Sequence, residues 1–201
     1  METQLFQNKY RIKSTRLKHW DYSSCGAYYV TICTKDRKYY FGEIIHRKMI
    51  LSTMGKIVEQ FWMEIPKHYP NIKLDEYVIM PDHIHGIIMI ENAMPNVETP
   101  QWGVSTGNDM NNRMTNKKRN PHHRPEWKSN SLGSIICQFK SIATKQIRET
   151  GFYDFAWQSR FHEHIIRDEI EFNQKRKYII NNPLKWVLNK KMDFDNHTTT
   201  I

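Results

Sequence analysis

The sequence predicts an α+β fold, with a ferredoxin-like antiparallel sheet and helices on one side. Segments rich in β-branched and aromatic residues alternate along the chain with segments of helical periodicity. Two of the extended segments are joined by Pro81-Asp82, a connection typical of an antiparallel hairpin. The order is strand, helix, hairpin of strands, helix, extended segment, helix. An antiparallel sheet covered by helices is the economical arrangement for that order.

The first half of the chain supplies strands and an amphipathic helix. Residues 27–33 (AYYVTIC) predict a strand because β-branched and aromatic side chains favour a pleated, half-buried surface. Residues 41–51 predict one or two short strands. Ser52 is placed to cap a helix over residues 53–68, in which apolar residues recur every three or four positions.

Next comes the hairpin, with strands predicted over residues 73–80 and 83–90. The ferredoxin-like arrangement places the second of these strands in the middle of the sheet. In the second half of the chain, apolar spacing predicts a helix over residues 131–148 and an extended aromatic segment over 155–166. Asp168 or Glu169 is expected to open a last helix, which runs from Glu171 to about Asn182 and which Pro183 would stop.

The chain of 201 residues is expected to form one main domain with appendages. Residues 1–26 are polar and basic and predict an N-terminal arm. Residues 27–186 form the predicted domain, interrupted over about 92–130 by a segment rich in Asn, Pro, Thr, Gly, Lys and Arg that predicts a flexible insertion. Residues 187–201 are expected to form a C-terminal tail.

Composition narrows the class of protein. Lys and Arg outnumber Asp and Glu by 30 to 21, which favours a polyanionic partner, with nucleic acid first and a membrane surface second. There is no apolar run long enough to span a membrane, and the first residues lack the apolar stretch of a signal peptide. Three cysteines without CxxC spacing favour reduced thiols, so we expect a cytoplasmic protein without a membrane partner.

His83 and His85 are the first candidate site residues. Alternate side chains of a strand point to the same face, so both imidazoles are expected on one face and Ile84 on the other. Two neutral imidazoles side by side provide half of a divalent-metal site. The alternative, a polar sheet face without a metal, stays open at this point.

The expected last helix offers the missing parts of such a site. Tyr178 and Asn182 are four residues apart and would share a helix face. Asn182 could supply an oxygen ligand and Tyr178 an attacking phenol, although a tyrosine on a helix is also a common core-edge residue. The preceding Lys175, Arg176 and Lys177 could neutralise a phosphate backbone. Oxygen ligands combined with imidazoles suit Mg²⁺ or Mn²⁺ in phosphoryl chemistry.

Together these motifs resemble a known family. His83-Ile84-His85, preceded by Met80-Pro81-Asp82, resembles the histidine–hydrophobe–histidine (HUH) motif of single-tyrosine transposases of the IS200-like superfamily. Residues 157–167 (WQSRFHEHIIR) and 178–183 (YIINNP) are similar to the REP-associated branch of these tyrosine transposases (RAYT). The resemblance covers residues 27–186 except for the expected insertion.

The resemblance implies an HUH architecture and a role for each matching residue. His83, His85 and Asn182 would bind Mg²⁺ or Mn²⁺, and Tyr178 would attack a single-stranded DNA phosphodiester, giving a 5′-phosphotyrosine and a free 3′-OH. The partner would be a single-stranded DNA hairpin, bound by a monomer or a homodimer. Residues expected to bind DNA are Lys140, Lys145, Arg160, Lys175, Arg176 and Lys177.

Alternative interpretations remain open from the sequence. Tyr153 is a second candidate nucleophile, less favoured because a loop would hold it. A nickase like the relaxases or replication initiators would share the histidine pair, but many of those enzymes carry a histidine triad or a second tyrosine. A non-catalytic protein that binds single-stranded nucleic acid could use a similar sheet with exposed aromatic residues.

Overall fold

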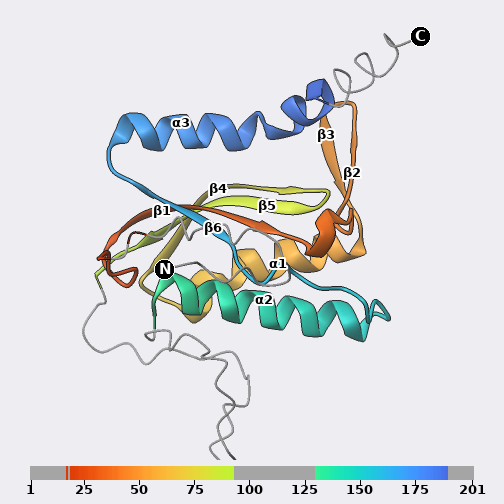
Figure 1. Cartoon of the computed structure of the whole chain (residues 1–201), viewed down its shortest axis with the longest axis horizontal. Helices are drawn as coiled ribbons and strands as arrows, with labels where there is room; N and C mark the ends of the chain where they lie inside the picture. The colour runs from red at the N-terminus through yellow and green to blue at the C-terminus, as the bar shows by residue number, and fades with distance from the viewer. Residues whose placement is uncertain (1–16, 18, 93–129, 190–201) are drawn as a thin grey trace, which may run out of the picture.

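A computed structural model describes residue 17 and residues 19–92 and 130–189 of the chain (Figure 1). Most of the expected arm 1–26, insertion 92–130 and tail 187–201 lies outside these residues. The elements, in order, are β1 (Gly26–Cys33), η2 (Lys35–Arg37), β2 (Gly42–Ile45), β3 (Lys48–Leu51), α1 (Thr53–His68), β4 (Ile72–Met80), β5 (His83–Ile90), α2 (Leu132–Glu149), β6 (His162–Ile166) and α3 (Glu169–Ile180).

The main sheet has the strand order β4-β5-β1-β6, and all three neighbouring pairs are antiparallel. With β2 and β3 set aside as a separate hairpin, this is the ferredoxin-like order that the sequence predicts. The histidine strand β5 lies between β4 and β1, with Ile84 opposite Ile32 and His85 opposite Thr31. The α+β class, the hairpin and the central place of β5 are confirmed.

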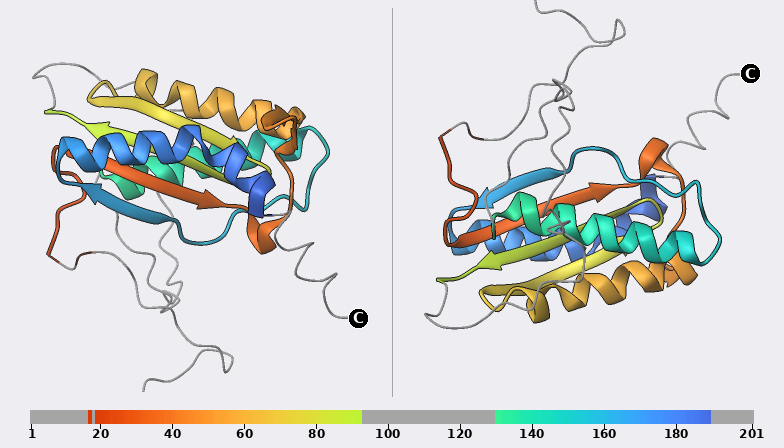
Figure 2. Two further views of the ribbon diagram at one scale, coloured as in Figure 1. Left: turned by 90° about the horizontal axis from the view of Figure 1, so that it is seen from above. Right: turned by 90° about the horizontal axis from the view of Figure 1, so that it is seen from below.

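Helices cover both faces of the sheet. Helices α1 and α2 lie on one face and α3 lies across the other, as Figures 1 and 2 show from the side and from above. The expectation that the helices share one side therefore holds for α1 and α2 and is wrong for α3. The reason lies in β5, which is buried on both faces: Ile84 and Ile88 belong to the larger core, whereas Ile87 packs in a second cluster with Ile179 of α3. A strand that is apolar on both faces needs a layer on each.

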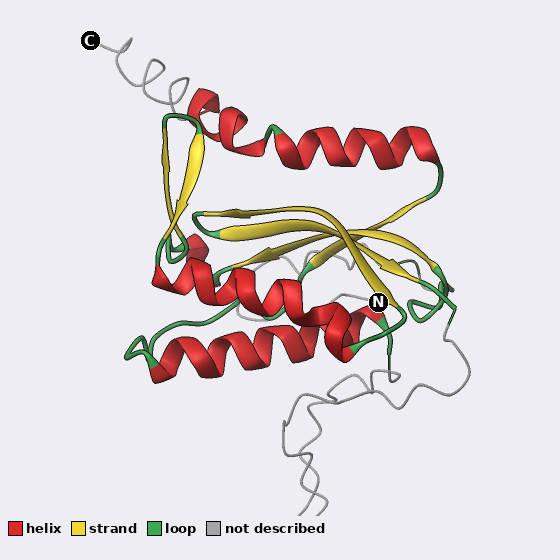
Figure 3. Cartoon of the chain, turned by 180° about the vertical axis from the view of Figure 1, so that it is seen from behind, coloured by secondary structure: helices red, strands yellow, loops and turns green. Residues whose placement is uncertain are grey.

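The two long helices begin and end near the predicted positions. The Ser52 hydroxyl accepts a hydrogen bond from the Gly55 amide at 3.1 Å, and Ser131 caps α2 in the same way through the Ser134 amide. Both helices lie under the sheet (Figure 3). Their apolar faces meet there, and Trp62 of α1 packs edge-to-face on Phe139 of α2. Among the described residues, no helix is long and apolar enough to cross a membrane.

The last helix opens where the sequence predicts but does not stop at Pro183. Helix α3 begins at Glu169, where Asp168 caps it by accepting a hydrogen bond from the Glu171 amide at 2.8 Å, and it ends at Ile180. After Asn181 the helix resumes over 182–189. Pro183 therefore does not stop the helical path. It occupies the first turn of the new segment, where a missing N–H has no consequence.

Glycine is required at position 86 of β5 because the Trp62 side chain leaves no room for a Cβ atom there. A Cβ at this position would lie 2.4 Å from Cζ2 of the fully buried Trp62. We expect Gly86→Ala to lower the free energy of unfolding by about 1–3 kcal/mol, as overpacking does, in a urea denaturation experiment. Trp62→Phe removes the clashing ring carbon, so the double variant should lose less than the sum of the two single losses. A simple sum would contradict this explanation.

Candidate active site

His83 and His85 project together from the central strand toward α3. Their Nε2 atoms are 3.0 Å apart, and both residues are buried. Ile84 between them is fully buried in the opposite layer, among the core residues under α1 and α2. The alternation that the sequence predicts for this strand is therefore confirmed, and both imidazoles face the same point in space.

The other ring nitrogen of each histidine is held by a neighbouring residue. His83 Nδ1 lies 2.5 Å from Asp82 Oδ1, and the second carboxylate oxygen of Asp82 is 2.8 Å from Arg37 Nε. Because a carboxylate only accepts hydrogen bonds, His83 Nδ1 donates in this contact, and Nε2 is the nitrogen that faces His85. Such an outer carboxylate is the usual support of a metal-binding histidine.

His85 Nδ1 has two hydroxyl neighbours on β1. The Tyr29 hydroxyl is 2.7 Å away and the Thr31 hydroxyl 2.9 Å away, both on the same sheet face as His85. When either oxygen accepts from Nδ1, the Nε2 lone pair of His85 also points at the shared position. The sheet thus holds both imidazoles from behind, through Asp82 and through the two hydroxyls of β1.

Tyr178 and Asn182 complete one pocket with the histidines. The pocket has a volume of about 460 Å³ and is lined by Thr31, Arg37, His83, His85, Tyr178, Asn182, Lys185, Trp186 and Asn189. The Tyr178 ring centroid lies 5.3 Å from that of His85, and the Lys185 ammonium lies 4.7 Å from the Tyr178 ring centroid. Tyr178 is 39% exposed, so its phenol is accessible, whereas Asn182 is buried.

Asn182 is the candidate third ligand. It opens the helical segment 182–189, so the break after α3 places it against the sheet while Tyr178 stays on α3. Asn182 lines the same pocket as His83 and His85. The described part of the chain has no group of three or more His, Cys, Asp or Glu side chains able to hold a metal. A metal at the two Nε2 atoms would therefore depend on the Asn182 amide oxygen for a third protein ligand.

Burial sets the protonation states of His85 and of the neighbouring Tyr29. It lowers the pKa of His85 to about 3, and the nearby His83 and Arg37 lower it further in the same direction. Burial also raises the pKa of Tyr29 to about 12, so that hydroxyl stays protonated. His85 is consequently neutral at physiological pH, which is the form that binds a metal.

The lowered pKa of His85 has a consequence for stability. In the unfolded chain an imidazole titrates near its ordinary value of 6.5, and in the metal-free native protein near 3. Between these pH values the unfolded chain binds more protons, so the free energy of unfolding should fall as the pH falls from 6.5 toward 3, by up to about 1.4 kcal/mol per pH unit. Urea denaturation at several pH values measures the slope. His85→Gln should flatten it, whereas replacing the exposed His46 by Gln should not; equal slopes in all three proteins would contradict the assignment.

The predicted DNA-binding residues of the last helix differ in their surroundings. The Lys175 ammonium lies 4.8 Å from the Tyr29 ring centroid, beside the site. Arg176 is engaged by Asp75, with its Nε 2.6 Å from Asp75 Oδ1. Lys177 is exposed. Lys175 is thus the member of this cluster that the structure brings near the histidines.

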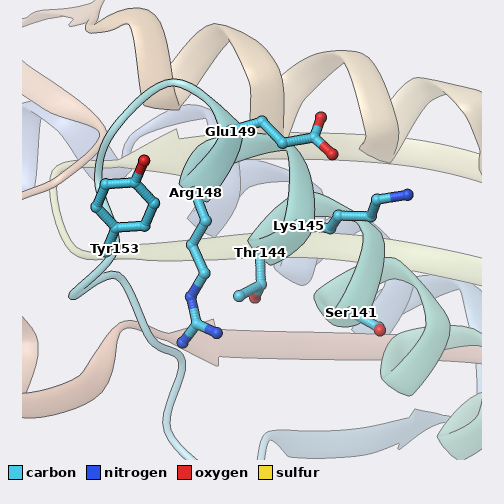
Figure 4. A pocket seen from close by; sticks show the side chains of 6 residues that line it. All are labelled: Ser141, Thr144, Lys145, Arg148, Glu149 and Tyr153. Atoms are coloured by element: carbon cyan, nitrogen blue, oxygen red, sulfur yellow. The ribbon is translucent and has the colours of Figure 1, made fainter.

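The remaining predicted DNA-binding residues do not line the pocket of the histidines. Lys140 on α2 donates to the Gln158 carbonyl at 2.5 Å, and burial lowers its pKa to about 8. Lys145 borders a separate hollow at the end of α2, which Arg148 and Tyr153 also line (Figure 4). Arg160 is exposed in the segment before β6. Their roles stay predictions.

Sequence reasoning missed several residues of the pocket and its supports. These are Tyr29, Thr31, Arg37, Lys185 and Trp186, together with the supporting role of Asp82. Tyr29 and Thr31 repeat the i, i+2 spacing of the histidines on a predicted strand, which is a usable signal. Arg37 offered none, because only its ion pair with Asp82 brings it to the site.

Comparisons with known proteins assign the chain to a family. No protein-family model matches it. A protein of Haemophilus influenzae described as uncharacterized is 38% identical over 175 residues, which cover 87% of this chain and 89% of the relative. The chain belongs to the same family as this Haemophilus protein. Because the match spans nearly all of both sequences, the two members of the family share the whole domain.

A solved structure of a REP-associated tyrosine transposase bound to a REP hairpin has the same fold. The TM-score is 0.50 at 17% identity, over 87% of this chain and 74% of the transposase. The architecture expected from the histidine and tyrosine motifs is therefore confirmed.

Proposed function

We propose that the protein is a metal-dependent transposase that cuts and rejoins single-stranded DNA through a covalent bond to Tyr178. The supporting observation is the convergence of two histidine Nε2 atoms, a buried amide and an accessible phenol in one pocket, contributed by β5, α3 and the segment 182–189. Its fold is that of a transposase whose structure holds a REP hairpin, which favours a single-stranded DNA hairpin as the partner here.

The donor set fits a divalent ion. His83 and His85 would supply nitrogen and Asn182 oxygen, with Asp82 orienting His83, and Mg²⁺ or Mn²⁺ is the ion we propose. When bound, the ion would polarise the scissile phosphate and neutralise its charge. Arg37 and Lys185, which line the same pocket, add positive charge where a phosphate would lie.

The protein's own part in the reaction is nucleophilic. The Tyr178 phenolic oxygen would attack phosphorus, the phenol proton would leave, and the bond from phosphorus to the 3′ oxygen would break as that oxygen takes up a proton. The products are a 5′-phosphotyrosine and a free 3′-OH. Because the bond to tyrosine keeps the phosphate activated, the 3′-OH of another strand can reverse the step and join DNA.

The proposal is tested with a pool of single-stranded DNA hairpins that carry randomised unpaired flanks and a fluorescent label. We expect cleavage with Mn²⁺, none with EDTA, and a labelled protein band that survives denaturation. Binding without cleavage under all metal conditions would favour the non-catalytic alternative. Cleavage without a covalent band would contradict the tyrosine mechanism.

A further inference from the structure

Two aromatic rings extend from the pocket toward solvent. Trp186 lines the pocket, and its ring centroid lies 5.9 Å from that of His83 at an interplanar angle of 38°. The Tyr39 ring meets Trp186 edge-on, with centroids 5.6 Å apart. Tyr39 lies between η2 and β2 and Trp186 in the segment 182–189, so two distant parts of the sequence bring these rings together. The rings of His83, Trp186 and Tyr39 form a row that leads from the buried imidazole of His83 to the surface.

The outer ring, Tyr39, lies outside the hydrophobic core. Tyr39 is 57% exposed, and neither Tyr39 nor Trp186 belongs to the two core clusters of the described residues. The adjacent Tyr40 does pack inward, with its ring centroid 5.2 Å from that of Phe155. The chain therefore uses one of two neighbouring tyrosines for the core and presents the other to solvent beside the site.

Each of these rings has a cation next to it in the sequence. Arg37 precedes Tyr39 by two residues and Lys185 precedes Trp186 directly, and both cations line the pocket. Lys38, next to Tyr39, is exposed. Cations that hold phosphates beside aromatic rings that stack on bases are the usual means of binding single-stranded nucleic acid. A base that is still paired inside a duplex offers no free face to such a ring.

We propose that Tyr39, supported by Trp186, is a stacking platform for an unpaired base next to the scissile phosphate. This inference rests on the proposed function, because the phosphate would occupy the histidine pocket. The adjoining nucleotide would leave the pocket past Trp186 and place its base on the exposed Tyr39 ring. The platform would give the enzyme a preference for hairpins with an unpaired flank over blunt hairpins.

The test is a double-mutant cycle between ring and base. Full-length protein carrying Tyr178→Phe, which blocks cleavage, is titrated with a labelled hairpin whose flanking nucleotides are replaced one at a time by abasic sites. We expect Tyr39→Leu to weaken binding of the intact hairpin about tenfold, and Tyr39→Phe to leave it unchanged. At one flanking position, the abasic site should weaken hairpin binding by the protein that keeps Tyr39 by a similar factor. The same abasic site should not weaken binding by the Tyr39→Leu protein any further.

Controls separate stacking from other causes. Tyr153 is 76% exposed and borders the distant hollow at the end of α2 (Figure 4), so Tyr153→Leu should leave binding unchanged. A 2-aminopurine placed at the responsive position should be quenched on binding, and Tyr39→Leu should abolish the quenching. Equal losses for intact and abasic hairpins, or no loss with Tyr39→Leu, would overturn the platform while leaving the proposed function intact. Failure of the unsubstituted protein to bind or cut any single-stranded hairpin would overturn both.

Discussion

Replacing Tyr178 by phenylalanine is expected to abolish the covalent protein–DNA adduct and leave hairpin binding intact. The change removes only the hydroxyl, so the ring can keep its place 5.3 Å from the His85 ring and under the Lys185 ammonium. Without that oxygen no phosphotyrosine can form, and the loss of a nucleophile reduces a rate by about a millionfold in well-studied enzymes. Denaturing electrophoresis of labelled DNA measures the adduct, and fluorescence anisotropy measures binding.

Tyr153→Phe is the matched control for this experiment. Tyr153 is the alternative nucleophile, and it borders the hollow at the end of α2 and not the histidine pocket (Figure 4). We expect its variant to form the adduct at the normal rate. An adduct that persists in Tyr178→Phe and disappears in Tyr153→Phe would reverse the assignment.

Replacing His83 or His85 by alanine is expected to abolish metal-dependent cleavage. Each variant removes one of the two Nε2 atoms that lie 3.0 Å apart, and Asn182 with a single imidazole is a poor site for a divalent ion. We expect Mn²⁺ affinity and the cleavage rate each to fall by about a thousandfold, since metal stabilisation of the transition state is worth several kcal/mol. Isothermal titration calorimetry measures the first and single-turnover kinetics the second.

Two further variants control for the histidine experiment. His46, between β2 and β3, is exposed and does not line the pocket, so His46→Ala should bind Mn²⁺ and cleave normally. Asp82→Asn keeps both imidazoles and removes only the carboxylate behind His83, so it should weaken Mn²⁺ binding by about 10- to 100-fold. Unchanged Mn²⁺ affinity in His83→Ala would contradict the metal site itself.

Local patterns were enough to predict most of the fold. Ser52 and the apolar spacing after it define α1, and Pro81-Asp82 between two apolar runs defines the hairpin of β4 and β5. These features depend on neighbours in the sequence, so they can be inferred without the tertiary structure. The side of the sheet on which α3 lies could not be inferred in that way, because it depends on which face of β5 the first two helices leave open.

The candidate site likewise combines features that follow from local sequence and features that depend on the tertiary structure. The sequence alone determined that His83 and His85 share a face, because strand alternation is a local property. It also supplied Tyr178 and Asn182 through their resemblance to a family motif. Only the tertiary structure decided that the helical break after Ile180 brings Asn182 against the sheet, and that Arg37, Lys185 and Trp186 enter the pocket. Contacts such as those of Arg37 with Asp82 and of Trp186 with His83 join segments that are far apart in the sequence, and packing between layers sets them. No local pattern records such packing.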